Sequence, residues 1–281
     1  KLAQSLKLKS LAKYPVLCAN VRLKEGNKEA YLPYVIKSIS GLKVGIYGLT
    51  TMEGATYPAG KEGLVFEEPI AASQRIVPEL RKQCDIVVAV THIGVDEDQK
   101  LAAAVKGIDV IVGGHSHTML PHGLQIAPYK QSNYRQTTVI VQNFQWAGTL
   151  GRLDLKILKE KNGTCHVDSF NANLLPVLSS TPPDPAVAKV VSTFWNPILF
   201  KYAEVVGNAA NDFTERGQDK AQYNLVADAV LDSFKLDFDL ENNGGVRAPL
   251  VKGPVTYGDL LTMDPFGNTI VTFKVMGRDL K

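Results

Sequence analysis

Short apolar runs alternate with amphipathic stretches over the first 160 residues of the chain. The apolar runs predict strands, and the stretches between them have the three-to-four residue spacing of helices. The predicted strands cover residues 43–49, 85–90, 109–112, 138–142 and 152–157. The predicted helices cover residues 69–83 and 96–106. This alternation indicates an α/β sheet, and the polar alternation within the last strand indicates that one of its faces is exposed.

A proline-rich break at residues 181–185 ends this pattern. Since proline is tolerated in the first turn of a helix, the break predicts a helix over residues 186–203. A further helix is expected at residues 222–234, followed by a glycine turn and short strands. We therefore expect three parts. These are a first domain over residues 1–180, a linker helix over residues 181–204 and a second domain over residues 205–281.

Composition narrows the class of protein without naming a chemistry. A chain of 281 residues suits two domains, and 45% apolar with 21% charged residues is ordinary for globular proteins. The formal net charge of +3 does not imply a surface for a nucleic acid polymer. No apolar run approaches the roughly 18 to 20 residues of a membrane span. Cys18, Cys84 and Cys165 fit no zinc or redox spacing, so we interpret them as buried free thiols.

The two ends of the chain have no features of a natural start or stop. The sequence opens inside a leucine-rich amphipathic run, without an initiator methionine or a signal peptide. It stops at residue 281 without a recognisable end. We expect a chain cut at both ends, so the absence of a signal peptide carries no weight.

Three histidines follow two neighbouring predicted strands. His92 comes just after the strand at residues 85–90, and His115 and His117 follow the next strand across a Gly-Gly turn. Ligands bind at the carboxyl ends of parallel strands, and imidazole is the commonest neutral metal ligand. One such histidine is usually a hydrogen-bonded loop residue, but three at adjacent strand ends favour a metal site. His122 and His166 lack this context, and we interpret both as surface residues.

Several segments resemble those of a known enzyme family. Residues 91–94 (Thr-His-Ile-Gly) and 113–118 (Gly-Gly-His-Ser-His-Thr) resemble two late motifs of the calcineurin-like metallophosphoesterases. Residues 14–20 resemble the strand that follows the family's Asn-His-Glu motif. Residues 242–247 and 264–268 resemble the C-terminal nucleotide-binding domain of the 5′-nucleotidases. In this order, the motifs make nearly the whole chain similar to bacterial and animal 5′-nucleotidases.

The resemblance implies a fold and a metal centre. The fold would be a partial metallophosphoesterase sheet sandwich of the α/β class, then a linker helix and a partial α+β nucleotide-binding domain. His92 and His115 would bind one of two divalent metal ions, and His117 the other, with zinc, manganese or cobalt as candidates. The family's remaining ligands and its catalytic His-Asp dyad would lie upstream of Lys1. We therefore assign no catalytic residue to this chain and expect it to be inactive alone.

The resemblance also implies a nucleotide site in the second domain. Its residues would be Arg216, Asn242, Gly245, Arg247, Phe266 and Asn268. The arginines would bind the substrate, Phe266 would stack on the base, and the asparagines would bond the base and ribose. Without the resemblance, the arginines would be surface residues, Phe266 a core residue beside a proline, and the asparagines turn formers.

The expected activity is metal-dependent hydrolysis of nucleoside 5′-monophosphates by the parent enzyme, in the periplasm or outside the cell. Two alternatives within the family remain open, which are cleavage of 2′,3′-cyclic nucleotides and of nucleotide sugars. A third is a fragment that binds nucleotides without catalysis. The expected partner is a nucleotide, and neither a nucleic acid polymer nor a membrane span is expected. The oligomeric state is open.

Overall fold

The computed structural model describes residues 2–127, 137–216, 219–242 and 244–280. The chain divides into two units, residues 1–181 and 182–281, each of which is described by itself. The division falls in the proline-rich break at residues 181–185.

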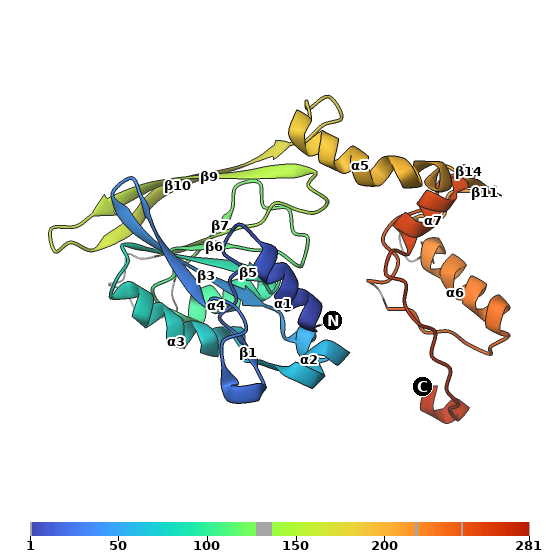
Figure 1. Ribbon diagram of the computed structural model, residues 1–281, viewed down its shortest axis with the longest axis horizontal. Coiled ribbons are helices and arrows are strands. Elements are labelled where there is room, and N and C mark those ends of the chain that lie inside the picture. Colours follow the sequence, from blue (N-terminus) through green and yellow to red (C-terminus); the bar gives the residue numbers. More distant parts are fainter. Residues whose placement is uncertain (1, 128–136, 217–218, 243, 281) are drawn as a thin grey trace. The chain divides into compact units, whose positions relative to one another are not determined.

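The first unit is built on a six-stranded sheet in the order β2-β3-β5-β6-β8-β7 (Figure 1). Strands β3, β5, β6 and β8 run parallel, while β2 and β7 pair antiparallel at the two edges. The predicted α/β sheet is therefore confirmed. In sheet order the strands are β2 (Tyr34–Ile39), β3 (Leu42–Thr50), β5 (Ile86–His92), β6 (Val110–Val112), β8 (Thr138–Val141) and β7 (Leu124–Ile126).

Two helices, α3 (Pro69–Arg81) and α4 (Val95–Ala104), lie against one face of this sheet (Figure 1). Pro69 occupies the first turn of α3, where its missing N–H is not needed. The apolar stripe of α3 includes Ile76, Val77 and Leu80, which are buried against the sheet. The main core of the unit lies between these helices and the sheet, where the apolar side chains are almost completely buried. Removing this apolar surface from water stabilises the fold.

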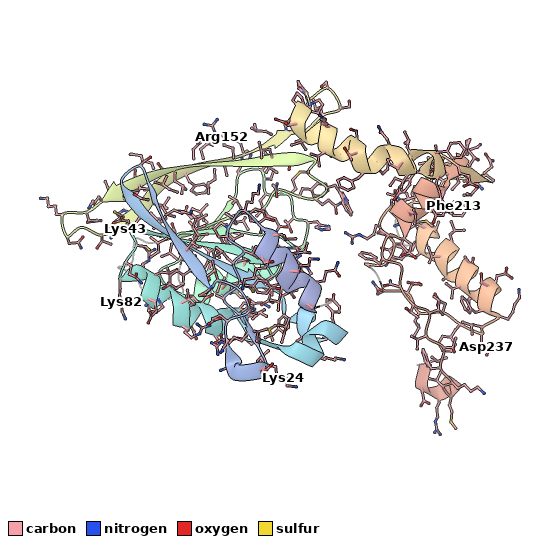
Figure 2. The ribbon with its side chains drawn as sticks, viewed as in Figure 1. Lys24, Lys43, Lys82, Arg152, Phe213 and Asp237 are labelled. Carbon is pink, nitrogen blue, oxygen red and sulfur yellow. The ribbon has the colours of Figure 1, made fainter. Side chains whose placement is uncertain are left out.

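A long hairpin of β9 (Thr149–Lys159) and β10 (Cys165–Pro176) lies on the other side of the sheet (Figure 1). Along β9, half-buried Leu153 and Leu155 alternate with exposed Arg152 and Asp154. The predicted exposed face of this strand is therefore confirmed, and Arg152 projects from it (Figure 2).

Smaller elements complete the first unit. They are α1 (Leu2–Leu11), β1 (Val21–Leu23), which pairs with β4 (Leu64–Phe66), α2 (Pro58–Gly63), and 3-10 turns at Glu25–Asn27 and Met52–Ala55. The N-terminal leucine run does form a helix, but Leu8 and Leu11 are 61% and 66% exposed. Its apolar face is therefore not buried as an amphipathic pattern predicts.

The second unit opens with α5 (Pro185–Tyr202), whose N-cap Asp184 accepts hydrogen bonds from two backbone amides. Strand β11 (Val205–Ala209) pairs with β14 (Gly253–Thr256), and β12 (Glu215–Arg216) pairs with β13 (Asp219–Lys220). Helices α6 (Ala221–Phe234) and α7 (Tyr257–Met263) and a 3-10 turn at Gly277–Leu280 follow. The small core contains Ala209, Val246, Leu250, Val255 and Met263.

Two expectations about single side chains are wrong. His166 is not a surface residue, because its side chain is only 12% exposed and lies 3.7 Å from Glu160. Cys84 is half-buried, whereas Cys18 and Cys165 are buried, and all three are free thiols. Among the described residues, no helix combines the length and the apolar character that crossing a membrane requires.

Candidate functional site

Two histidines meet where adjacent parallel strands end. Strands β5 and β6 pair in parallel up to Val90 and Val112. His92 is the last residue of β5, and the chain beyond β6 brings His115 beside it. Their ring centroids are 5.1 Å apart, with the rings inclined at 64°.

The backbone around these histidines is bent sharply. His115 and His117 have φ angles of +76° and +52°, in the left-handed region that side chains other than glycine seldom adopt. Gly114 lies so close to His92 that an added Cβ would be 3.1 Å from its Nδ1. Glycine at this position therefore lets the turn approach the imidazole.

A carboxylate that we did not predict lies at the same site. Glu53 Oε1 is 3.6 Å from His115 Nε2. Glu53 belongs to the 3-10 turn that follows β3, the parallel neighbour of β5. Glu53 follows the carboxyl end of a parallel strand as the histidines do, and this position is the sequence signal that points to it.

The electrostatic environment favours a neutral imidazole at His92. Burial lowers the pKa of His92 most, positive charge on His115 and His117 lowers it further, and Glu53 opposes them. A neutral imidazole has the free lone pair that a metal ion requires.

The imidazole and carboxylate groups at this site are suitable metal ligands. Of the three predicted histidine ligands, however, only His92 and His115 have their rings side by side. Imidazole and carboxylate ligands fit zinc, manganese or cobalt. Over the residues that the structure describes, no group of three or more histidine, cysteine, aspartate or glutamate side chains is arranged to hold an ion. His117 lies beside Trp146, with 6.1 Å between ring centroids.

In the second unit, two predicted substrate residues are in contact. The Arg247 guanidinium carbon lies 5.9 Å from the centroid of the Phe266 ring, within the range of a cation–π interaction. The Arg247 backbone N–H donates to the Met263 carbonyl at 2.7 Å, which ties this segment to the end of α7. Phe266 is 54% exposed, so the alternative that it is a core residue is wrong.

The other predicted substrate residues are less closely grouped. Gly245 is buried, and its N–H donates to the Asn242 carbonyl at 2.9 Å. With its amide oxygen turned toward the glycines, the Asn242 side chain also accepts from the Gly244 N–H at 3.2 Å. Asn268 is exposed. Arg216 lies in β12, and its side chain is outside the described part of the structure.

Comparison with known proteins identifies relatives along the chain. Residues 205–281 match the family model of the 5′-nucleotidase C-terminal domain. A 5′-nucleotidase of Vibrio cholerae is 27% identical over 98% of this chain and 57% of its own length. The trifunctional nucleotide phosphoesterase YfkN of Bacillus subtilis is 30% identical, over 98% of this chain and 19% of its own length.

Solved structures support the same relationship. The crystal structure of a 5′-nucleotidase precursor from Thermus thermophilus superposes with a TM-score of 0.82 at 27% identity. The match covers 95% of this chain and 56% of the Thermus chain. This chain therefore spans little more than half the length of that relative. Residues 205–281 therefore belong to the 5′-nucleotidase C-terminal domain family, and the chain as a whole is similar in sequence and fold to 5′-nucleotidases.

Proposed function

We propose that the protein to which this chain belongs hydrolyses nucleoside 5′-monophosphates to nucleoside and phosphate, with the aid of two divalent metal ions. The observation that carries this proposal is the pair of histidines, His92 and His115, at the ends of adjacent parallel strands in a chain of this family. Ions held there would neutralise phosphoryl charge and lower the pKa of a bound water.

The chain's own residues have separate roles in this proposal. His92 and His115 share one ion and His117 takes part in binding the other, while Glu53 adds negative charge beside His115. Strand β5 ends at His92, and the Gly-Gly turn after β6 holds the backbone of His115 beside it, which reduces the loss of entropy on binding an ion. Zinc, manganese and cobalt all suit the donors.

The second unit is proposed to hold the nucleotide. The Arg247 guanidinium bonds an anionic or polar group of the substrate, and the exposed Phe266 ring stacks on the base. Arg216, Asn242, Gly245 and Asn268 complete this site. The contact between Arg247 and Phe266 supports the assignment, since it brings a charge donor and a stacking surface together.

The fold by itself does not select the substrate. A sulfate thiohydrolase, SoxB, matches the chain with a TM-score of 0.75 at 19% identity, so the architecture supports more than one hydrolysis. Cyclic nucleotides and nucleotide sugars are the alternative substrates, and binding without catalysis is the alternative for the chain alone. The rate of phosphate release from each substrate class distinguishes these cases.

The test uses the whole protein and two histidine variants. His115→Ala should abolish most phosphate release from adenosine monophosphate in the presence of manganese, while leaving the protein folded. His122→Ala is the matched control, because His122 is exposed and lies outside the strand-end site. Near wild-type turnover in folded His115→Ala protein would rule out the metal role of this residue.

We also propose that the whole protein works in the periplasm or outside the cell. The Thermus relative is described as a 5′-nucleotidase precursor, which suits a secreted protein. Cell fractionation of the native host, followed by immunodetection, tests this location. Recovery of the protein in the cytoplasmic fraction would contradict it.

A further inference from the structure

The loop that carries His115 and His117 needs support from outside itself. Both histidines hold left-handed φ angles, which an L-residue adopts at an energetic cost. Such conformations persist where surrounding contacts fix the backbone. The neighbouring strands should therefore contain a group that holds this loop.

Gln142 supplies these contacts from the end of β8. Its side chain is buried, and its Oε1 accepts from the Thr118 backbone N–H at 2.5 Å and from the Ser116 hydroxyl at 3.1 Å. Its Nε2 donates to the Gly114 carbonyl at 3.3 Å. The Gln142 amide therefore makes hydrogen bonds with Gly114, Ser116 and Thr118, which lie before, between and after the two histidines.

The same network connects the loop to helix α4. The Ser116 hydroxyl, which donates to Gln142, also accepts from the backbone N–H of Val95 at 3.1 Å. Val95 is the first residue of α4, so this bond satisfies one of the free amides at the helix start. The loop is therefore held from β8 on one side and from α4 on the other.

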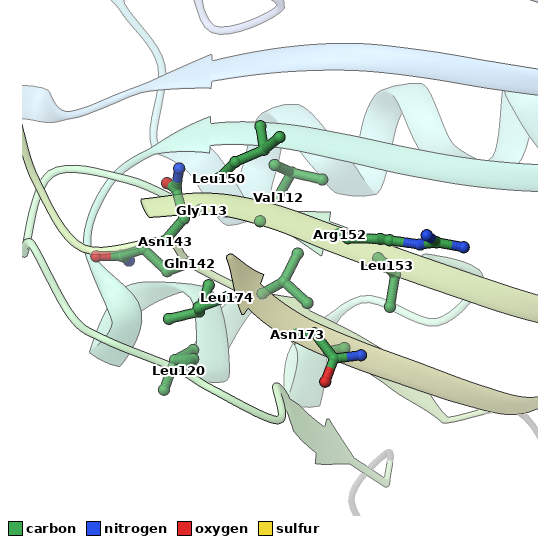
Figure 3. Close-up of a pocket in the computed structure, with 13 residues that line it drawn as sticks. Val112, Gly113, Leu120, Gln142, Asn143, Leu150, Arg152, Leu153, Asn173 and Leu174 are labelled. Carbon is green, nitrogen blue, oxygen red and sulfur yellow. The ribbon is translucent and has the colours of Figure 1, made fainter. Parts of the chain in front are cut away.

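Space beside Gln142 makes the residue suitable for substitution. It lines a cavity of ≈220 Å³ between the main sheet and the β9–β10 hairpin, together with Asn143, Leu120 and Leu174 (Figure 3). A leucine of similar volume can occupy this position without crowding its neighbours, while it loses all three side-chain hydrogen bonds.

We propose that Gln142 is a positioning residue, whose amide holds the loop of residues 114–118 in the shape that directs His115 and His117 toward the metal ions. The proposal rests on the proposed function, because it takes these histidines as ligands. Gln142 itself touches neither the ions nor the substrate. Its effect is exerted through the backbone of the loop.

The test compares Gln142→Leu with Gln125→Leu in the whole protein to which the chain belongs. Gln125 is exposed on β7 and bonds Thr137, so its variant loses a glutamine hydrogen bond away from the loop. The first measurement is the set of histidine ring 1H–15N NMR signals in metal-free protein. The second is Co2+ binding, followed by calorimetry and by the visible absorption of the ion.

We expect Gln142→Leu to shift the His115 and His117 signals and to weaken Co2+ binding about 10- to 100-fold, the usual effect of losing a group that orients a ligand. Gln125→Leu should change neither. Gln142→Glu keeps an acceptor for Thr118 and Ser116, so its His115 and His117 signals should lie closer to those of the wild type. A folded Gln142→Leu protein with unchanged ring signals and Co2+ affinity would overturn the proposal.

Further variants keep the test decisive. If Gln142→Leu does not fold, Ser116→Ala removes one bond of the network and should shift the same ring signals by a smaller amount, and unchanged signals would overturn the proposal. If His115→Ala binds Co2+ as the wild type does, His115 is not a metal ligand. The claim that Gln142 directs this histidine toward the ions is then overturned as well. The NMR signals of the metal-free protein then still decide whether Gln142 holds the loop.

Discussion

Phe266 combines an exposed aromatic face with a cationic neighbour, which is an unusual environment for a phenylalanine. This ring is 54% exposed and has the Arg247 guanidinium carbon 5.9 Å from its centroid. Guanidinium groups and bases both interact with aromatic faces, so the pair can recognise a nucleotide through charge and stacking together.

Phe266→Ala should therefore weaken binding of adenosine monophosphate to the whole protein by ~1 to 3 kcal/mol, the usual value of one base–aromatic stack. The loss should be smaller for p-nitrophenyl phosphate, which has less stacking surface. Inhibition and turnover assays on both substrates give the comparison. Phe273→Ala is the control, since Phe273 is 56% exposed in the same unit. Equal losses on both substrates would indicate a structural role for Phe266.

Asp98 is a buried carboxylate whose charge should make stability depend on pH. It is fully buried, and although Thr91 donates to its Oδ1 at 2.7 Å, its Oδ2 has no hydrogen-bond partner among the residues that the structure describes. Desolvation raises the pKa of Asp98 from 3.8 to about 6. Since the folded state holds this proton more tightly than the unfolded state does, folding becomes more favourable as the pH falls from about 6 toward 3.8.

Asp98→Asn removes the buried charge and this pH dependence. In metal-free protein, the free energy of unfolding of the variant should exceed that of the wild type by ~2 kcal/mol near pH 7, with the difference vanishing near pH 4. Urea unfolding at several pH values measures both curves. Asp96→Asn, an exposed position of the same helix, should leave the curve unchanged. A wild-type stability that falls between pH 7 and pH 5 relative to Asp98→Asn would contradict this assignment.

At the scale of secondary-structure elements, helix α7 links a capping motif to the proposed nucleotide site. The Thr256 hydroxyl accepts from the Asp259 N–H, and the Asp259 carboxylate accepts from the Thr256 N–H, which together form a capping box. The hydrogen bonds that the Asp259 carboxylate accepts from the Thr256 N–H and from the Thr256 hydroxyl lower the pKa of Asp259, so their stabilisation is present above its unfolded pKa and is lost as the pH falls. At the other end of α7, the Met263 carbonyl accepts a hydrogen bond from the Arg247 backbone N–H.

Thr256→Ala should lower the free energy of unfolding by about 1 kcal/mol, as is usual for the loss of an N-cap side chain. Because α7 supports the Arg247 segment, nucleotide affinity of the whole protein should fall as well. Chemical denaturation and calorimetric titration with adenosine monophosphate measure the two effects. Thr262→Ala, which changes a hydroxyl within the same helix, should have less effect on both. An unchanged unfolding free energy in Thr256→Ala would show that the cap does not stabilise the unit.

The elements that can be predicted from the sequence are those with a clear pattern of apolar residues. Helix α3 and strands β3 and β5 are long and strongly patterned, and their existence and type are confirmed. Strand β6 is predicted by its unbroken apolar run although it has only three residues, whereas the equally short β7 is interrupted by Gln125 and is not predicted. The predicted strand at residues 85–90 ends two residues before β5 does, because the ladder continues through His92, which pairs with Thr50. Backbone hydrogen bonding, which the side-chain pattern does not report, extends the strand.

The candidate site was predictable to a similar degree. Motifs at strand ends located His92 and His115, and the argument from parallel strands explained why they meet. The contact between Arg247 and Phe266 and the bonds of Gln142 depend on side-chain directions across distant segments. Spacing along the sequence carries no information about those directions, so they could not have been predicted from it.

At the scale of the whole molecule, the proposed metal centre has few potential ligands among the described residues. No group of three or more such residues comes together in the described ranges of the structure. Neutral imidazoles supply no negative charge to offset two divalent ions, so we expect residues 1–281 alone to release phosphate from adenosine monophosphate at a negligible rate. Phosphate release after metal removal and addition of manganese or zinc tests this. Robust, metal-dependent turnover would contradict the expectation.

The register of the central sheet also limits which insertions and deletions the protein can accept. His92 occupies the final rung of the β3–β5 ladder, and Thr91 before it points to the helix side, where it bonds Asp98. Successive strand residues point to opposite faces, so removing one residue from the middle of β5 would turn the imidazole toward α4 and the threonine outward. Changes of length near this histidine should therefore be confined to the turns outside the ladder.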